Sequence, residues 1–369
     1  IWEAQRKCPG LVIRPARFHE YVRWSRAVRD IYARYTDLIE PFGIDECWLD
    51  VTHSKIFGDG ERIAERIRVE VREELGLTVS VGVSFNKVFA KLASDLKKPD
   101  AVTVVGREEV RGKIWPLPVS DLLFVGKATA KKLSSVGIST IGQLAAAEPS
   151  FLKKFLGKWG ETLSAYARGE DNSPVRHMNE SADLKSIGNS LTYREDIYNY
   201  EDVKRLLYVL SESVAARLND SGLGKADTVH LWVRDKELEN YSFQKKVRPT
   251  ALCGEIAETA YALFRTQYKT RRAVRGLGVT VSGFDKGVRQ MTLDDLSGEY
   301  EKKERAEKAV DEIRKKYGYS KIQRGIMFED RSALSMDVRG ERLVRPGGVD
   351  GEVASQDDGE PDMEPFEGD

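Results

Sequence analysis

The spacing of apolar residues changes character twice along the chain, and these two changes constrain the fold more than any other feature. Up to about residue 118, runs with helical spacing alternate with short runs typical of strands. Between residues 119 and 180 the strand patterns stop, and glycines separate several short helices. From 185 to 285 the order is β-α-β-β-α-β, which is typical of two helices on an antiparallel sheet. The sequence therefore predicts an α+β chain of several domains.

Periodicity also gives the expected elements. In the first segment we expect helices at 17–35, 60–75 and 86–96, and strands at 39–42, 47–51, 78–84 and 102–105. In the third we expect strands near 187–194, 228–234, 241–248 and 274–281, and helices near 200–219 and 254–268. A charged helix over 299–317 has a narrow apolar side, Ala306, Val310 and Ile313, so we expect it to be solvated or to face a partner.

Charge is balanced overall but not along the chain. There are 59 Lys+Arg and 59 Asp+Glu, yet acidic residues gather in a Gly- and Pro-containing tail at 326–369. Such a tail buries too little apolar surface to fold, so we expect it to be disordered. The rest of the chain is mildly basic, which permits an anionic partner, and 286–325 is expected to be a linker that includes the charged helix.

Membrane and disulfide classes are not indicated. No apolar run approaches the ~20 residues that a membrane-spanning helix needs. No signal segment is recognisable at the start of the sequence. The three cysteines, Cys8, Cys47 and Cys253, form no CxxC pair, which argues against a disulfide framework and a structural zinc site. A reducing, cytoplasmic location is the simplest interpretation.

The first candidate site is the segment 42–50, which reads FGIDECWLD. Neighbouring side chains of a regular strand point to opposite faces, so Asp45 and Glu46 can converge on one cation only at a turn or bulge, which Gly43 favours. Paired carboxylates suit Mg²⁺, a hard cation that is usually shared with substrate phosphates. Taken alone, such a pair more often belongs to a solvated turn.

The second candidate site covers residues 81–99. A strand runs into a helix at Ser84 or Asn86, both good capping residues, and helix N-termini bind anions. Lys98 precedes Pro99, leaves the helix in an extended conformation and can present an ammonium group to a triphosphate. Taken alone, a capped helix with solvated lysines is the better interpretation.

The third candidate site consists of two short helices around a glycine turn, within 123–144. Its pattern, h-x-G-x-x-T/A-x-x-L…G-I-x-T-I-x-x-L, resembles a helix-hairpin-helix motif, whose exposed N–H groups bind the DNA backbone without reading sequence. Phe124 stands where such motifs often carry another glycine. A plain αα-hairpin is the alternative.

In this order and spacing, the three segments resemble a Y-family (translesion) DNA polymerase of the DNA polymerase IV and UmuC-like class. The resemblance covers roughly residues 1–285. It rests on Pro15-x-Arg17-x-x-x-Tyr21, Ile44-Asp45-Glu46-Cys47-Trp48-Leu49-Asp50, Val81-Gly82-Val83-Ser84-x-Asn86-Lys87-x-x-Ala90-Lys91-x-Ala93-Ser94, Lys98-Pro99, Lys185-Ser186-Ile187-Gly188 and Arg271-Arg272-x-x-Arg275-x-Leu277-Gly278-Val279.

The resemblance implies an incomplete ferredoxin-like palm at 1–118, a helix-hairpin-helix thumb at 119–180 and a little finger at 185–285. It implies that Asp45 and Glu46 bind two Mg²⁺ ions for DNA-templated nucleotidyl transfer in error-prone lesion bypass, and that Lys98 contacts the incoming dNTP. The residues implied or favoured as contacts to primed DNA are Ser84, Asn86, Lys87, Gly126, Lys127, Thr129, Lys185, Arg194, Lys245, Lys246, Arg248, Arg271 and Arg272.

One departure concerns the start of the chain. The family opens with a strand that carries another metal-binding aspartate, followed by an aromatic steric gate and a fingers subdomain, and nothing in this sequence matches them. The chain begins at Ile1, at a point that looks like the one just after the fingers, so we expect a fragment or a natural truncation. We therefore expect it to bind primed DNA but to extend it poorly or not at all.

Other interpretations stay open. Gln290, Leu293 and Leu296 look like a degenerate form of the peptide that docks on the sliding clamp, although a polar linker explains them equally well. We expect a monomer. Besides a polymerase, the chain fits a non-catalytic DNA-binding remnant of one, or a palm-based nucleotidyl cyclase. The helix-hairpin-helix and the basic sandwich count against the cyclase.

Overall fold

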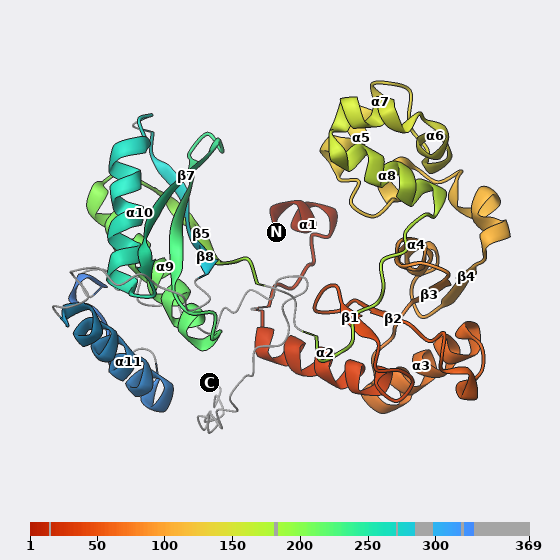
Figure 1. Cartoon of the computed structure of the whole chain (residues 1–369), viewed down its shortest axis with the longest axis horizontal. Coiled ribbons are helices and arrows are strands. Elements are labelled where there is room, and N and C mark those ends of the chain that lie inside the picture. Colours follow the sequence, from red (N-terminus) through yellow and green to blue (C-terminus); the bar gives the residue numbers. More distant parts are fainter. Residues whose placement is uncertain (15, 181–183, 271, 285–297, 319–320, 328–369) are drawn as a thin grey trace, which may run out of the picture. The chain divides into compact units, whose positions relative to one another are not determined.

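The computed structural model describes residues 1–14, 16–180, 184–270, 272–284, 298–318 and 321–327. They divide into two compact units, which meet in the sequence between residues 180 and 184 (Figure 1). Across these ranges, every helix is too short or too polar to cross a membrane.

The first unit starts with a layer of helices and short strands. Its elements are α1 (Trp2–Lys7), α2 (Phe18–Tyr32), β1 (Ile39–Pro41), β2 (Cys47–Leu49), α3 (Gly60–Leu75), β3 (Val81–Ser84), α4 (Lys87–Leu96) and β4 (Val102–Val105), with one-turn helices at Lys55–Phe57, Arg107–Glu109, Val110–Ile114 and Val119–Asp121. Local signals set several ends: Asp59 accepts a hydrogen bond from the Arg62 amide at the start of α3, and Gly76 ends it in the left-handed conformation.

The strands of this layer form two separate sheets. β1 pairs antiparallel with β2, and β3 pairs parallel with β4 across the connection made by α4. In the described chain no strand hydrogen-bonds to both pairs, so these four strands do not form one continuous sheet, and the incomplete ferredoxin-like palm stays a prediction.

Four short helices complete the first unit: α5 (Lys127–Ser134), α6 (Ile141–Ala146), α7 (Pro149–Leu156) and α8 (Lys158–Arg168). They share a core with α4, since Phe89 and Leu92 are buried in the same cluster as Leu133, Leu152 and Leu163. The helical segment thus shares a core with α4 and β4, whereas α2 and α3 pack on a separate cluster that includes Ile31, Ile63 and Val71.

The second unit has the predicted order β-α-β-β-α-β. Its elements are β5 (Ser186–Ile197), α9 (Tyr200–Asp220), β6 (Ala226–Asp235), β7 (Asn240–Thr250), α10 (Cys253–Gln267) and β8 (Val274–Phe284). The sheet order is β5-β8-β6-β7 and all neighbours are antiparallel, so each β-α-β crossover spans one intervening strand. Helices α9 and α10 lie on one face of this sheet (Figure 1).

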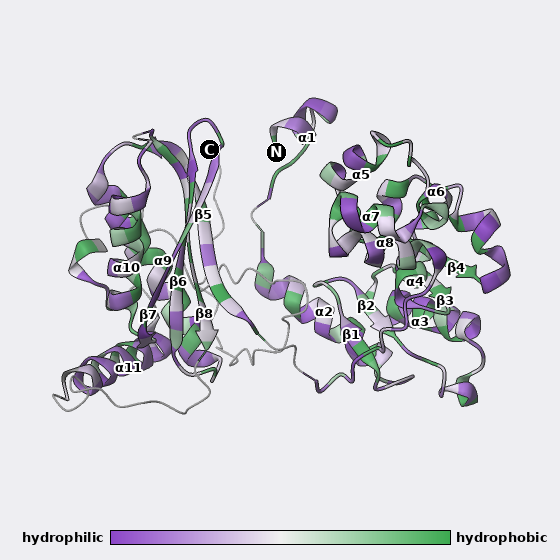
Figure 2. Ribbon diagram, turned by 45° about the horizontal axis from the view of Figure 1, so that its top comes forward, coloured by the Kyte–Doolittle hydropathy of each residue, from purple (hydrophilic) through white to green (hydrophobic). Residues whose placement is uncertain are grey.

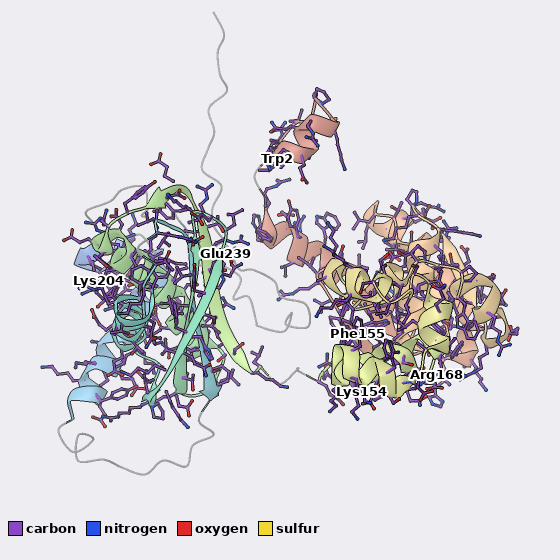
Figure 3. All side chains as sticks on the ribbon, turned by 90° about the horizontal axis from the view of Figure 1, so that it is seen from above. Trp2, Lys154, Phe155, Arg168, Lys204 and Glu239 are labelled. Carbon is purple, nitrogen blue, oxygen red and sulfur yellow. The ribbon has the colours of Figure 1, made fainter. Side chains whose placement is uncertain are left out.

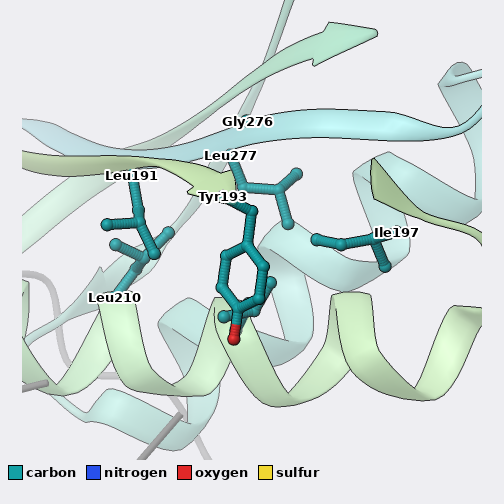
Figure 4. Close-up of a pocket in the computed structure, with 7 residues that line it drawn as sticks. Leu191, Tyr193, Ile197, Leu210, Gly276 and Leu277 are labelled. Carbon is teal, nitrogen blue, oxygen red and sulfur yellow. The ribbon is translucent and has the colours of Figure 1, made fainter. Parts of the chain in front are cut away.

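The two faces of the sheet differ as strand alternation requires. Leu191 and Tyr193 of β5 point toward α9, next to Leu277 of β8 (Figure 4). Ser190 and Thr192, which alternate with them, are exposed. On β6, Trp232 lies against Gly276 and Gly278, where an added Cβ would be 3.2 Å from the indole ring.

Helix α11 (Glu299–Tyr317) packs against the second unit and is followed by a short turn at Gly325–Met327. It is mostly hydrophilic (Figure 2). Two residues of its narrow apolar side, Ala306 and Ile313, are exposed, which agrees with the expected solvated side, whereas Tyr300 and Arg314 are buried against the second unit. The reason is Glu212 of α9, which is 2% exposed and accepts a hydrogen bond from the Arg314 guanidinium at 3.1 Å.

Candidate functional site

The hairpin β1–β2 brings the two adjacent carboxylates to its tip. The amides of Phe42 and Gly43 both donate to the carbonyl oxygen of Glu46, at 2.9 and 3.2 Å, which closes the loop 42–46. A Cβ added at Gly43 would lie 3.6 Å from Asp45 Oδ1, so the Asp45 side chain folds back over the glycine. Asp45 and Glu46 therefore lie in a turn rather than on opposite faces of a strand.

Helix α4 places a lysine beside this tip. Lys91 Nζ lies 3.1 Å from Glu46 Oε1 and 2.6 Å from Asp95 Oδ2, one helical turn further along. Lys98 Nζ lies 2.7 Å from the other oxygen of Asp95. A chain of alternating charges thus runs from the hairpin to the predicted triphosphate-binding lysine.

Ionisation along this chain is mutually supported. Burial alone disfavours the charged form of Lys91, but its hydrogen bonds to Asp95 and Glu46 outweigh this and raise its pKa. Burial likewise opposes ionisation of Asp95, whereas hydrogen bonds from Lys91 and Lys98 outweigh it and lower the pKa of its carboxyl. Lys91 and Asp95 are therefore charged at neutral pH.

The carboxylates at the hairpin tip fit Mg²⁺ in chemical type. Mg²⁺ prefers oxygen ligands and is commonly held by one or two protein carboxylates, with substrate phosphates and water completing its shell. Among the described residues no group of three metal-ligating side chains occurs. Asp45 and Glu46 can supply such a carboxylate pair, and the other ligands must then come from outside this group.

A second ion cluster fixes the start of α4. Lys87 Nζ lies 2.5 Å from Glu40 Oε2 on β1, and the Arg176 amide donates to the same oxygen at 3.0 Å. The side chains of Glu40 and Lys87 are 12% and 11% exposed. Burial opposes ionisation of Glu40, but hydrogen bonds from Lys87 and Arg176 outweigh it and hold its pKa below the usual value.

The other motif residues of this strand and helix also bond within the protein. Asn86 caps α4 by accepting from the Phe89 amide at 2.8 Å, and its Nδ2 donates to the carbonyl of Gly169 at 2.9 Å. Ser84 Oγ donates to the Val105 carbonyl at 2.8 Å, which ties β3 to β4. With Lys87 paired to Glu40, Ser84, Asn86 and Lys87 thus hold the unit together, and their contact with DNA stays a prediction.

The helical segment contains the predicted helix pair around a glycine turn. Gly126 precedes α5 without a side-chain cap, so the first amides of this helix, including those of Lys127 and Thr129, have no intrahelical partner. Phe124, which stands where such motifs often carry a glycine, has a φ of 69°, a backbone conformation that favours glycine. Its ring contacts Trp159, with 5.6 Å between centroids.

Helices α7 and α8 also carry basic residues. Lys154 and Phe155 lie on α7, and Arg168 ends α8 (Figure 3). Arg168 is held by Glu170 at 2.8 Å and donates to Ser164 Oγ at 2.6 Å.

The predicted basic residues of the second unit have different surroundings. Lys185 is exposed just before β5, and Lys245 is exposed on the edge strand β7. Arg248 instead lies over the ring of Tyr300 on α11, 5.1 Å from its centroid, and Arg272 pairs with the buried Asp235 at 3.0 Å. The structure thus gives Arg248 and Arg272 intramolecular partners, and their contact with DNA also stays a prediction.

Several predicted features lie outside the described residues. These are Arg271, the side chain of Arg194, the candidate clamp-binding residues Gln290, Leu293 and Leu296, and the acidic tail at 328–369.

Sequence reasoning gave no role to Glu40, Asp95 and Arg176, and Lys91 was noted only as part of a motif. For Lys91 and Asp95 the sequence did carry a signal. They follow Lys87 at intervals of four residues, which puts all three side chains on one face of α4. The partners Glu40 and Arg176 are 136 residues apart in the sequence, and no local pattern relates them.

Comparison with known proteins identifies the family. The impB/mucB/samB family matches residues 1–95, and its C-terminal domain matches residues 184–293. The chain is 47% identical over 335 residues to a DNA polymerase IV of Acetivibrio thermocellus, covering 90% of this chain and 84% of the relative. It is 36% identical over 334 residues to the DNA polymerase IV of Clostridium kluyveri, covering 87% and 82%.

A solved structure agrees with these relatives. A Y-family DNA polymerase chimera, Dbh-Dpo4(243-245)-Dbh, superposes with a TM-score of 0.66 at 26% identity, covering 77% of this chain and 82% of the chimera. The chain therefore belongs to the Y-family DNA polymerases, within the impB/mucB/samB family.

Proposed function

We propose that this chain carries out DNA-templated nucleotidyl transfer in translesion synthesis, and that the tip of the β1–β2 hairpin with α4 forms its metal- and triphosphate-binding end. The family membership supports the activity, and the relatives named DNA polymerase IV favour it over a DNA-binding remnant or a cyclase. The observation that carries the placement is the charge chain Glu46–Lys91–Asp95–Lys98, which joins the carboxylate pair to the lysine after α4.

In this proposal Asp45 and Glu46 hold Mg²⁺. When bound, the metal supplies Lewis-acid activation of the primer 3′-hydroxyl and neutralises charge on the transferring phosphoryl group. Lys98, whose side chain is 57% exposed, binds the phosphates of the incoming nucleotide. Burial raises the pKa of the neighbouring Cys47 thiol to about 11, and thiolates suit softer cations than Mg²⁺.

The DNA contacts are proposed for two surfaces. The uncapped start of α5, with Gly126, Lys127 and Thr129, offers backbone amides to a phosphate of the primer strand. Lys185 and Lys245, both exposed on the second unit, supply sequence-independent attraction to the duplex. The residues Gln290, Leu293 and Leu296 remain a proposed sliding-clamp peptide.

Primer extension by the full chain tests the activity. We expect Mg²⁺-dependent extension of a primed template under single-turnover conditions, with excess protein so that slow chemistry is detected. The Asp45→Asn/Glu46→Gln variant should lose extension by at least about 100-fold while its affinity for primed DNA changes little. The control is Glu61→Gln/Glu73→Gln on α3, which makes the same change in net charge at two exposed positions. Equal extension by the hairpin variant and the control would refute the assignment.

A further inference from the structure

The ammonium group of Lys91 occupies a cation position at Glu46. It lies 3.1 Å from Glu46 Oε1, and its side chain is 18% exposed, so it is held in place rather than free in solvent. Asp95 fixes it from the other side at 2.6 Å. A metal that binds Glu46 Oε1 must displace this partner, and one that binds the other oxygen is repelled by it.

We propose that Lys91 is a resident counter-cation that a divalent metal must displace from Glu46, and that Asp95 is the positioning residue that receives it. The inference rests on the proposed metal site at Asp45 and Glu46. It adds to that site a competition, called the Lys91 gate below: the affinity of the site for the metal depends on whether Lys91 pairs more strongly with Glu46 or with Asp95.

The electrostatics give the direction of each effect. A fixed positive charge about 3 Å from a ligating oxygen competes with the metal and repels it, so Lys91 lowers the affinity for a divalent cation. Asp95 opposes this by keeping Lys91 paired after it leaves Glu46. Without the Asp95 charge, Glu46 is the carboxylate partner that Lys91 keeps within the part of the chain that the structure describes, and displacement becomes harder.

Lys98, the second lysine that pairs with Asp95, does not prevent Lys91 from moving from Glu46 to Asp95. Lys98 binds Asp95 Oδ1 whereas Lys91 binds Oδ2, so the two ammonium groups do not compete for one oxygen. Lys87 cannot replace Lys91, because its ammonium group pairs with Glu40 and its side chain is only 11% exposed.

Mn²⁺ binding to the full chain, followed by the loss of the free-ion electron paramagnetic resonance signal, tests the Lys91 gate. We compare only the Mn²⁺ binding that is lost in Asp45→Asn/Glu46→Gln, called pair-dependent binding below. This excludes Mn²⁺ bound elsewhere on the chain. We expect Lys91→Met to tighten pair-dependent binding about fivefold. The matched control, Lys97→Met, removes the same charge from the exposed residue after α4 and should change it less than about twofold.

Asp95 is tested by a double-mutant cycle. Asp95→Asn should weaken the pair-dependent Mn²⁺ binding about threefold in the natural sequence, and by much less in the Lys91→Met background, because its effect passes through Lys91. Circular dichroism and urea unfolding show whether each variant is folded, and Lys91→Gln provides a second neutral substitution if Lys91→Met is not.

The outcomes separate the two proposals. If Lys91→Met leaves the pair-dependent Mn²⁺ binding unchanged or weakens it, the proposed role of Lys91 is wrong, whereas the metal site itself is supported. An equal effect of Asp95→Asn in both backgrounds also overturns the Lys91 gate, since Asp95 then acts by its own charge. Mn²⁺ binding that is the same with and without Asp45 and Glu46 overturns the metal site itself, and the Lys91 gate with it.

Discussion

At the scale of single residues, Gly82 shows how closely β3 approaches α4. A Cβ at this position would overlap the carbonyl oxygen of Ala90 and lie 2.5 Å from the amide nitrogen of Ser94. Both are backbone atoms, so a side chain can be accommodated only if the strand and the helix move apart. The glycine therefore sets the position of the helix that carries Lys91 and Asp95.

Gly82→Ala should destabilise the first unit by about 2–3 kcal/mol, because overpacking against backbone cannot be relieved by a rotamer change. The matched control is Gly112→Ala, where a new Cβ meets nothing within 4 Å. Urea unfolding monitored by tryptophan fluorescence compares the two. Equal unfolding free energies for both variants would show that β3 and α4 are not in close contact.

Glu40 gives a pH-dependent prediction. Its folded-state pKa lies below the ordinary value of 4.5, so it contributes stability above that pH and loses the contribution as the pH falls through the lowered pKa. Glu40→Gln leaves the nearly buried Lys87 without its carboxylate and should cost about 2 kcal/mol at pH 7. The difference in unfolding free energy between natural sequence and variant should shrink below about pH 4.5.

The measurement is urea unfolding of both proteins from pH 7 to the lowest pH at which they stay folded. Glu73→Gln, an exposed acid on α3, serves as the control and should show no such convergence. A difference that is constant with pH would mean that Glu40 ionises in the folded protein as it does in the unfolded one.

At the scale of elements, α11 is held to the second unit mainly by charged and polar groups. Glu212 accepts from Arg314 at 3.1 Å and from Arg324 at 3.0 Å, and Arg324 also pairs with Glu307 at 2.7 Å. The amide of Cys253, at the start of α10, donates to Glu307 Oε2 at 2.9 Å. The helix is thus tied both to α9 and to α10.

Glu212→Gln should destabilise the second unit by about 3 kcal/mol, because Arg314, 5% exposed, then loses the charge of the carboxylate that accepts its hydrogen bond. Hydrogen exchange measured by mass spectrometry should show faster exchange in the peptides of α11. Glu301→Gln, on the exposed side of the same helix, is the control. Unchanged protection of α11 in Glu212→Gln would contradict an anchoring role of this cluster.

The elements also show what sequence could and could not predict. The start of α4 is a local signal: the sequence indicated Ser84 or Asn86 as the capping residue, and Asn86 is the one that caps the helix. The burial of Arg314 was not predicted, because it depends on Glu212, about a hundred residues away, which draws this charged side of α11 inward. Periodicity predicts the buried side of a helix only when apolar contacts decide its packing.

At the scale of the whole molecule, the comparisons show the family, and the metal site at Asp45 and Glu46 is proposed. The motif order predicted the family, and the carboxylate pair was predicted to need a turn, which the loop 42–46 provides. The pairing of Lys91 with Glu46 was not predicted, because it joins a hairpin to a helix through tertiary structure. The same holds for the contact between Asn86 and Gly169, which ties α4 to the end of α8.

The central claim is that Asp45 and Glu46 hold the metal of a template-directed nucleotide site. The most direct measurement uses primed DNA with a dideoxy-terminated primer, so that no chemistry occurs, and follows the dissociation rate of the protein–DNA complex. With Mg²⁺, the dNTP complementary to the template base should slow dissociation, whereas the other dNTPs should not, and Asp45→Asn/Glu46→Gln should abolish the effect. Equal stabilisation by mismatched dNTPs, or full stabilisation in the variant, would contradict the account.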